Sequence, residues 1–152
     1  MRLTTKGRYA VTAVLDLAFH QNEGPVSLAA ISERQAISLS YLEQLFAKLR
    51  RNSIVKSTRG PGGGYNLGDT PENVCIADII SAVDEELQVT NKDVLEGAAS
   101  FEPCLTEQLW EELSEQIQDY LTTISLADMM ENEEVKLLSM NHDQRQKVDN
   151  LL

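Results

Sequence analysis

Polar side chains near residue 40 have the chemistry needed to recognise nucleic-acid bases. Glu43 and Gln44 are adjacent; a carboxylate can accept a hydrogen bond from a cytosine amino group, and a primary amide can pair with adenine through two hydrogen bonds. Ser40 and Tyr41 precede them, where hydroxyl groups and the free N–H groups of a helix N-terminus can bind a phosphate. The alternative interpretation is an ordinary solvated helix face, which carries similar residue types.

A second candidate is the segment STRGPGGG at residues 57–64, in which Arg59 stands beside a glycine-rich tip. Glycine permits backbone angles and close approaches that other residues do not, and an arginine beside such a tip can enter a minor groove or bind a phosphate. The glycines could instead form a nucleotide-phosphate loop. However, the segment lacks the Gly-Lys-Ser/Thr ending of that loop and does not lead from a buried strand into a helix.

The surrounding residues predict a helix-turn-helix followed by a β-hairpin. Ser27 can cap a first helix, and Ser38 or Ser40 can open a second one. The apolar face of the second helix consists of Leu42, Leu45, Phe46 and Leu49. Short strand-like runs at 54–56 and 65–67 flank the glycine-rich tip. In a helix-turn-helix the second helix can lie in the DNA major groove, so these elements favour DNA binding.

Three segments carry a resemblance to a known family: MRLTTKGRYAVTA at 1–13, SLSYLEQLF at 38–46 and RGPGGGY at 59–65. Over about residues 1–130 the chain resembles the IscR-like branch of the Rrf-two family of bacterial winged helix-turn-helix transcriptional regulators. The resemblance implies a homodimer whose subunits each present a recognition helix and a wing. Carried over position by position, the DNA contacts that it implies are Ser38, Ser40, Tyr41, Glu43, Gln44, Arg59 and Gly60.

The resemblance breaks down at the metal ligands. Cluster-binding members hold an iron–sulfur cluster with three cysteines and a histidine, spaced Cys-x5-Cys-x5-Cys-x2-His. The corresponding positions here are Lys92, Ala98, Cys104 and Glu107. Such clusters are held by four ligands, mostly thiolates, so we expect no cofactor and no metal. A substitute set, in which Cys104, Glu107, Glu102 or Asp93 combines with groups of the partner subunit, is the alternative.

Cys104 then needs another explanation, because it is the one family ligand position retained. It precedes a predicted helix, whose N-terminal dipole can activate a thiol. A redox sensor, a thiol that links two subunits and a residue without a role all remain open. Cys75 lies among apolar residues of a helix predicted over 74–86, and we expect it to be an inert core thiol.

A long amphipathic helix is predicted over residues 105–124. Its apolar stripe consists of Leu105, Leu109, Leu113, Ile117, Tyr120 and Leu121, and Trp110 widens it. Residues 1–85 can close a core of their own, so this stripe needs a further partner. A second copy is the simplest one, and packing onto its own domain is the alternative. Pairing would place two recognition helices about 34 Å apart, at successive major-groove faces.

The net charge of −11 argues at first against nucleic-acid binding. Residues 1–60, however, contain nine Lys/Arg and four Asp/Glu, a net charge of +5, whereas residues 61–152 contain four Lys/Arg and twenty Asp/Glu, a net charge of −16. The cations therefore lie in the segment expected to contact phosphates. The alternative is an acidic solubilising tail on a neutral domain.

The predicted fold is mainly α. It comprises a winged helix-turn-helix domain at 1–85, a loop at 86–104, a dimerisation helix with a short following helix at 105–131, and a tail at 132–152 that is flexible or a weakly docked helix. No apolar run approaches the roughly 20 residues of a membrane span, and the N-terminus lacks a signal-peptide core. We therefore expect a cytoplasmic protein without a membrane partner.

The leading functional prediction is a sequence-specific regulator, more specifically a repressor, that binds a double-stranded operator as a homodimer. The resemblance implies a signal connected with iron–sulfur, cysteine or redox status. The alternative is a protein-interaction module that docks, or is controlled by, a protein effector from cluster assembly or cysteine metabolism. An enzyme is not expected, because His20 and His142 are far apart in the sequence, read as surface residues and have no evident nucleophile partner.

Overall fold

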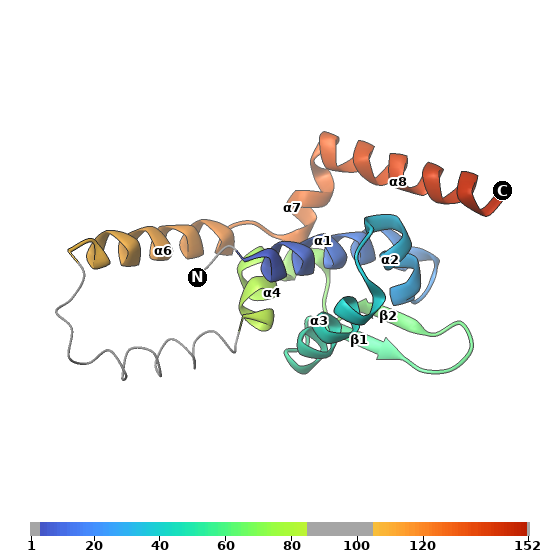
Figure 1. Cartoon of the computed structure of the whole chain (residues 1–152), viewed down its shortest axis with the longest axis horizontal. Coiled ribbons are helices and arrows are strands. Elements are labelled where there is room, and N and C mark those ends of the chain that lie inside the picture. Colours follow the sequence, from blue (N-terminus) through green and yellow to red (C-terminus); the bar gives the residue numbers. More distant parts are fainter. Residues whose placement is uncertain (1–3, 85–104, 152) are drawn as a thin grey trace.

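The computed structural model describes residues 4–84 and 105–151, which form a helical body with a projecting hairpin (Figure 1). The elements in chain order are α1 (Thr5–His20), η1 (Gln21–Glu23), α2 (Leu28–Gln35), α3 (Leu39–Arg51), β1 (Val55–Thr58), β2 (Gly64–Leu67), η2 (Pro71–Asn73), α4 (Ile76–Val83), α6 (Glu107–Thr122), α7 (Leu126–Glu131) and α8 (Glu133–Leu151). The predicted fold class, a winged helix-turn-helix with a long helix after it, is confirmed. The loop predicted at 86–104 lies outside the described residues.

Helices α2 and α3 form the helix-turn-helix, and a tight turn joins them. Ser27 caps α2 by accepting a hydrogen bond from the Ala30 N–H at 3.2 Å. Ser38 caps α3, because its Oγ accepts from the Tyr41 N–H at 3.2 Å; Ser40, the other predicted candidate, lies inside the helix. Between the helices, Ala36 adopts the left-handed conformation with φ of 55°. That single residue reverses the chain in place of a longer loop.

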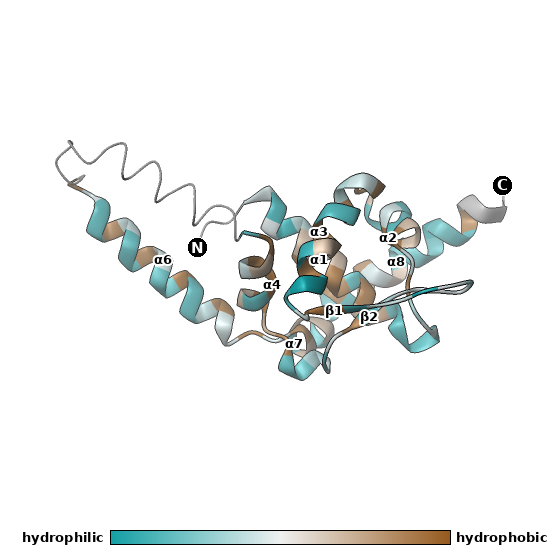
Figure 2. Cartoon of the chain, turned by 90° about the horizontal axis from the view of Figure 1, so that it is seen from below, coloured by the Kyte–Doolittle hydropathy of each residue, from teal (hydrophilic) through white to brown (hydrophobic). Residues whose placement is uncertain are grey.

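One hydrophobic core holds the helices together. The side chains with 0% exposure come from every layer of the body: Ala10, Ala13, Val14 and Leu17 of α1, Ile31 of α2, Leu42, Leu45, Phe46 and Leu49 of α3, Ile79 and Val83 of α4, and Leu126 of α7. Figure 2 shows the hydrophobic residues of these helices facing one another. Burial of such side chains contributes about 1.5–3 kcal/mol each, so the core fixes the orientation of α3 relative to α1.

The hairpin is anchored to the body at its base. Strands β1 and β2 pair in antiparallel register from Val55 opposite Leu67 to Thr58 opposite Gly64. Tyr65 extends this pairing to the segment before α2, since its backbone exchanges two hydrogen bonds with Val26. The ring of Tyr65 also stands edge-on to Phe46 of α3, with centroids 5.0 Å apart. The base of the hairpin is therefore fixed relative to α3.

Cys75 is not the core residue that the sequence suggested. Helix α4 begins at Ile76, so Cys75 occupies the N-cap position and is only half-buried. Its segment pairs instead with the start of α7, where Leu126 N–H donates to the Val74 carbonyl at 2.8 Å. Partial burial, together with a hydrogen bond to Asp78, raises the pKa of the Cys75 thiol. We still expect a thiol of low reactivity, but because its pKa is raised and not because it lies in the core.

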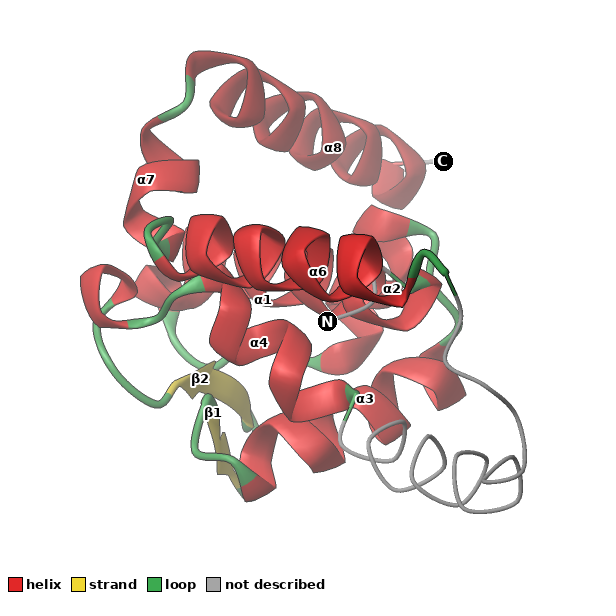
Figure 3. Cartoon of the chain, turned by 90° about the vertical axis from the view of Figure 1, so that its left-hand side faces the viewer, coloured by secondary structure: helices red, strands yellow, loops and turns green. Residues whose placement is uncertain are grey.

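The C-terminal segment is helical rather than an irregular tail. Asn132 accepts hydrogen bonds from the N–H groups of Glu134 and Val135, which starts α8 with side-chain partners. Helix α8 lies beside α2, on the side of the body away from α3 and the hairpin (Figures 1 and 3). This corresponds to the docked-helix alternative for the tail. Packing against distant residues explains the difference, because α8 shows little apolar periodicity of its own.

The two histidines are also less exposed than predicted. The side chain of His20 is 18% exposed and hydrogen-bonds to Asp143 of α8. His142 is half-buried and lies within hydrogen-bond distance of Gln35. Both histidines lie at the junction of α8 with the body, although they are 122 positions apart in the sequence.

Candidate nucleic-acid interface

Helix α3 presents a polar face to solvent. Leu42, Leu45, Phe46 and Leu49 are completely buried. Three residues predicted to recognise DNA, Ser40, Glu43 and Gln44, are exposed. Their spacing of three and four residues places them on one side of the helix, opposite the buried stripe. The structure thus brings together, on one outward face, carboxylate, amide and hydroxyl groups suited to base edges.

The start of α3 combines hydroxyl groups with a helix N-terminus. Ser38 and Ser40 have their Oγ atoms 3.4 Å apart, and both residues are exposed. The first turn contains no acidic residue. Because the helix dipole concentrates partial positive charge here, an anionic group such as a phosphate is favoured at this end of the helix.

Tyr41 is held more firmly than the sequence indicated. Its ring stands edge-on to Tyr9 of α1, with centroids 5.8 Å apart, and packs against the hydrophobic core. Burial raises the pKa of the Tyr41 hydroxyl, and the neighbouring Tyr9 adds to the effect. The hydroxyl therefore stays protonated at neutral pH and keeps its ability to donate to a phosphate. Sequence reasoning missed Tyr9 as its support, since the contact joins separate helices.

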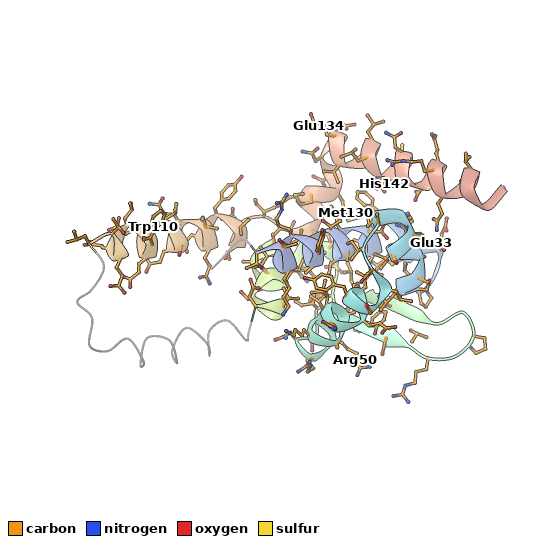
Figure 4. All side chains as sticks on the ribbon, in the orientation of Figure 1. Glu33, Arg50, Trp110, Met130, Glu134 and His142 are labelled. Atoms are coloured by element: carbon orange, nitrogen blue, oxygen red, sulfur yellow. The ribbon has the colours of Figure 1, made fainter. Side chains whose placement is uncertain are left out.

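Basic residues mark the other end of α3. Lys48, Arg50 and Arg51 lie in its last turn, where cations compensate the helix dipole. Arg50 donates to the Ser57 hydroxyl of β1 at 3.3 Å, which connects the helix to the hairpin. In Figure 4 Arg50 lies on the side of the body that carries the hairpin. This bond lies between two exposed groups, so a phosphate can replace Ser57 as the acceptor.

The hairpin tip is shaped by glycines. The Gly63 N–H donates to the Gly60 carbonyl at 2.9 Å, and Gly62 has φ of 75°, the pattern of a type II turn with Pro61 at its second position. Arg59 and Gly60 are exposed beside this turn. The tip is therefore narrow, and it carries one guanidinium group.

The predicted dimerisation stripe is largely unburied in the single chain. Leu109, Leu113 and Tyr120 are 57%, 43% and 66% exposed, Ile117 is half-buried, and Leu105 is fully exposed just before α6 begins. Trp110, at the edge of the stripe, is 57% exposed and projects from α6 in Figure 4. Helix α6 itself has no buried residue.

Leu121, in contrast, contacts its own domain. It packs against the hydrophobic core and lines a cavity of 270 Å³ together with residues of α1 and α4, namely Gly7, Arg8, Val11, Thr12, Ile76 and Ile80. The last turn of α6 is thus fixed to the body, and the rest of the helix extends away from it (Figure 1).

The family's metal-ligand positions are only partly described. Glu107 is the first residue of α6 and is exposed, whereas Lys92, Ala98 and Cys104 lie outside the described residues, as do Glu102 and Asp93. Within residues 4–84 and 105–151, no three His, Cys, Asp or Glu side chains are placed to hold a metal ion. By its chemistry, the donor set at the family positions does not fit an iron–sulfur cluster, because a lysine and an alanine replace two thiolates.

Among the described residues, no helix is both long enough and apolar enough to cross a membrane.

Known proteins share both the sequence and the fold. The Rrf2 family model, described as an iron-dependent transcriptional regulator, matches residues 3–132. The HTH-type transcriptional regulator IscR of Erwinia tasmaniensis is 55% identical over 139 residues, which cover 91% of this chain and 84% of that protein. The structure of T. potens IscR aligns with a TM-score of 0.69 and 42% identity over 86% of each chain. CymR, the global cysteine regulator of B. subtilis, aligns with a TM-score of 0.65 and 34% identity, over 84% of this chain and 95% of CymR.

Proposed function

Because the chain belongs to the Rrf2 (Rrf-two) family of winged helix-turn-helix transcriptional regulators, we propose that it recognises a specific double-stranded operator with α3 and the hairpin. One observation carries the proposal: α3 and the hairpin lie on the same side of the body (Figures 1 and 3), and the contacts Phe46–Tyr65 and Arg50–Ser57 join them. A major groove admits a helix, and a hairpin beside it reaches the neighbouring minor groove.

Each predicted contact has a distinct role in this proposal. In the major groove, Glu43 accepts a hydrogen bond from a base edge, and Gln44 both donates and accepts hydrogen bonds. These two residues determine the preferred sequence. Ser38, Ser40 and Tyr41 bind backbone phosphate at the start of α3, which sets the register of the helix. Arg59, presented by the turn at Gly60, enters the minor groove. The placement of these groups on exposed surfaces supports the assignment.

We also propose that the regulator is a homodimer formed through α6. The exposed side chains of Leu109, Leu113 and Tyr120 form an apolar face on a helix that projects from the body. A contiguous exposed stripe of this kind is typical of an interface, and two-fold pairing buries the same face of both copies. Two recognition helices about 34 Å apart would then bind the half-sites of a near-palindrome.

A dimer that occupies its operator can prevent transcription by occupancy alone, so we propose a repressor. Such a protein meets its DNA in the cytoplasm and needs no catalytic activity, in keeping with relatives that are transcriptional regulators. We propose that the regulating signal reaches the chain through a protein effector or a thiol, because one structural relative is described as a cysteine regulator. We further propose that the chain works without a cluster bound in the family's manner.

A protein-interaction module is the second candidate function. The observation in its favour is the same apolar face of α6, which could receive a different protein instead of a second copy. The molecular mass in solution distinguishes the two candidate functions. A dimer of the purified chain supports pairing with a second copy, whereas a monomer that co-purifies with another protein supports binding of a protein effector.

The proposed function is tested by recovering bound genomic DNA fragments with the purified chain at two salt concentrations. A sequence-specific regulator enriches a small set of fragments that share a near-palindrome, and their recovery falls steeply as salt rises because bound phosphates release counterions. Recovery of no double-stranded fragment at low salt would contradict the proposal.

A further inference from the structure

One side of helix α6 faces the body, and Trp110 lies on that side at the far end of the helix. The half-buried residues of α6 are Ser114, Ile117 and Leu121, and Trp110 continues their row because it precedes Ser114 by four positions. The spacing of four, three and four is that of a single helix face. Leu121 packs against the body, but α6 projects away from it, so Trp110 is 57% exposed (Figures 1 and 4).

The apolar face proposed for pairing lies about a quarter turn around α6 from this row. Leu109, Leu113 and Tyr120 are exposed, and a helix advances by about 100° per residue. Two copies that pair antiparallel through this face are related by a two-fold axis perpendicular to the plane of the two helices. Such an axis does not reverse the direction in which the row points. Both bodies therefore lie on the same side of the helix pair, at opposite ends.

Antiparallel pairing brings Trp110 of each copy to the body of the other. When Leu109 lies opposite Tyr120, Trp110 is level with Asp119, two positions before Leu121. Leu121 lines the 270 Å³ cavity of its own body, so the indole of the other copy faces that cavity. Parallel pairing would instead leave both indoles at the end of the helix pair that is remote from either body.

The cavity has the size and the lining that suit an aromatic side chain. It lies between α1, α4 and the last turn of α6, and the apolar side chains of Val11, Ile80 and Leu121 are part of its wall. A cavity of about 150 Å³ can hold a benzene ring in a protein interior, so 270 Å³ accommodates the two fused rings of an indole. Typical small-molecule sites are larger, at roughly 300–1,000 Å³.

The rim of the cavity and the start of α6 have opposite charges. Helix α6 contains five Asp/Glu and no Lys/Arg, so two copies of it repel each other. Arg8 is exposed at the rim, and among the described residues it has no salt bridge. Glu107 and Glu111 are exposed one turn apart, three positions before and one position after Trp110. In the antiparallel register they approach Arg8 of the other copy, which offsets the repulsion.

We propose that Trp110 of a second copy fills this cavity, and that Glu107 and Glu111 beside it pair with Arg8 at the rim. The inference rests on the proposed pairing through α6 and specifies its register. Residue Tyr9, next to Arg8, supports the ring of Tyr41 at the start of α3. The α6 helix of one copy thus contacts the helix that supports the recognition helix of the other.

The fluorescence of Trp110 tests the proposal directly, because it is the single tryptophan of the chain. Emission and quenching by iodide are measured on the full-length chain over a dilution series, and light scattering gives the molecular mass of the same samples. The Leu113→Glu variant supplies the reference spectrum of the monomer. The expected result is that emission of the dimer is shifted to the blue and is quenched less than emission of the monomer.

A double-mutant cycle shows whether Trp110 contacts the cavity wall. Trp110→Ala should raise the dissociation constant of the dimer by roughly 30-fold, as for a buried aromatic anchor, and Val11→Ala should raise it by about fivefold. In the Trp110→Ala background, Val11→Ala should change it by less than about twofold, because residues in contact are not additive. Leu137→Ala shortens a side chain on α8 that is 60% exposed, and as the control it should have no effect.

Exchange of charges tests the contact at the rim. Arg8→Glu should raise the dissociation constant by roughly threefold or more. Glu107→Lys combined with Glu111→Lys should restore dimerisation in that background, since the opposite charges then face each other again. Glu112→Lys combined with Glu115→Lys changes the charge of α6 equally, on the side away from the body, and should improve the Arg8→Glu variant no more than it improves the wild type.

Four results would overturn the proposal. A dimer whose Trp110 is as accessible to iodide as that of the monomer would leave the cavity without the indole, although pairing through α6 would stand. Effects of Trp110→Ala and Val11→Ala that multiply would place the ring outside the cavity. Equal rescue by both pairs of lysines would remove Arg8 from the contact. A chain that is monomeric at every concentration would refute the pairing as well, whereas recovery of genomic fragments would still test DNA binding separately.

Discussion

Val26 and Tyr65 are paired through two backbone hydrogen bonds of 2.9 and 2.8 Å, although the first lies before the helix-turn-helix and the second lies in the hairpin. This pairing ties the hairpin to the start of α2, while Phe46 ties it to α3. The angle between the hairpin and the recognition helix is therefore determined at its base, where the chain has little freedom.

Gly64→Ala should detach the base of the hairpin. A Cβ at Gly64 would lie 2.5 Å from the backbone carbonyl group of Val26 and 2.9 Å from the Ser27 nitrogen, and backbone atoms cannot move aside as a side chain can. We expect a loss of about 1–3 kcal/mol in unfolding free energy and weaker operator binding, measured by urea denaturation and fluorescence anisotropy.

Gly62→Asn is the matched control for that change. A Cβ at Gly62 meets no atom within 4 Å, and asparagine tolerates positive φ better than other residues with side chains. Its unfolding free energy should stay close to that of the wild type. Equal losses in both variants would show that the close approach at Val26 is unimportant.

Glu43→Ala should relax base preference more than it weakens non-specific binding. The variant loses a hydrogen-bond acceptor for a base edge, but it also removes a negative charge that phosphates repel. Affinities for a panel of single-base operator variants, measured at constant salt, check this result. Glu72→Ala, which removes an exposed carboxylate on η2, is the control. An unchanged ranking of the panel after Glu43→Ala would refute the role of Glu43.

Arg59→Ala should weaken binding to all DNA sequences to a similar degree. The exposed guanidinium group is proposed to neutralise phosphate or minor-groove potential, so its removal should lower the salt dependence of log K by about one unit. Titrations at several salt concentrations measure that slope. Lys136→Ala removes an exposed cation on α8, away from the hairpin, and should leave the slope unchanged. An identical slope for both variants would exclude Arg59 from the interface.

Leu113→Glu should dissociate the dimer. The side chain lies at the middle of the exposed stripe of α6, and a carboxylate buried there against a second copy would be unpaired. Light scattering should give the mass of one chain, and operator affinity should fall because one recognition helix binds alone. Gln118→Glu adds the same charge on the other side of α6 and should remain dimeric. A Leu113→Glu variant that stays dimeric would place the interface elsewhere.

Purification without oxygen should yield a protein without a stoichiometric iron–sulfur cluster. The positions of the family's ligands hold Lys92, Ala98, Cys104 and Glu107, of which one is a thiol. Visible absorbance together with iron and sulfide analysis measures the content. A stoichiometric cluster that disappears in Cys104→Ala would contradict this expectation and would establish a substitute ligand set.

Local interactions explain which elements could be predicted. The cap at Ser27, the apolar stripe of α3 and the glycine turn depend on residues within a few positions of one another, so residue types and spacing were sufficient. The capping box at Ser125 and Asp128, which starts the short helix α7, is local in the same way. The choice between Ser38 and Ser40 was open in the sequence, because both are followed by plausible first turns. In the structure Ser38 is the cap, next to the buried Ile37.

Tertiary structure alone decided the contacts between distant residues. The ring of Tyr41 on Tyr9, the pairing of Val26 with Tyr65 and the bond between His20 and Asp143 join residues from 32 to 123 positions apart. The sequence around each of these residues contains no pattern that indicates its partner. The C-terminal helix is the clearest case. The polar side through which it contacts the body has the residue types of a solvated helix face, and only the tertiary structure places the buried ion pair of Asp16 and Arg34 next to it. The spacing of apolar residues predicts which side of a helix is apolar. Only the tertiary structure decides which charged groups contact the polar side of that helix.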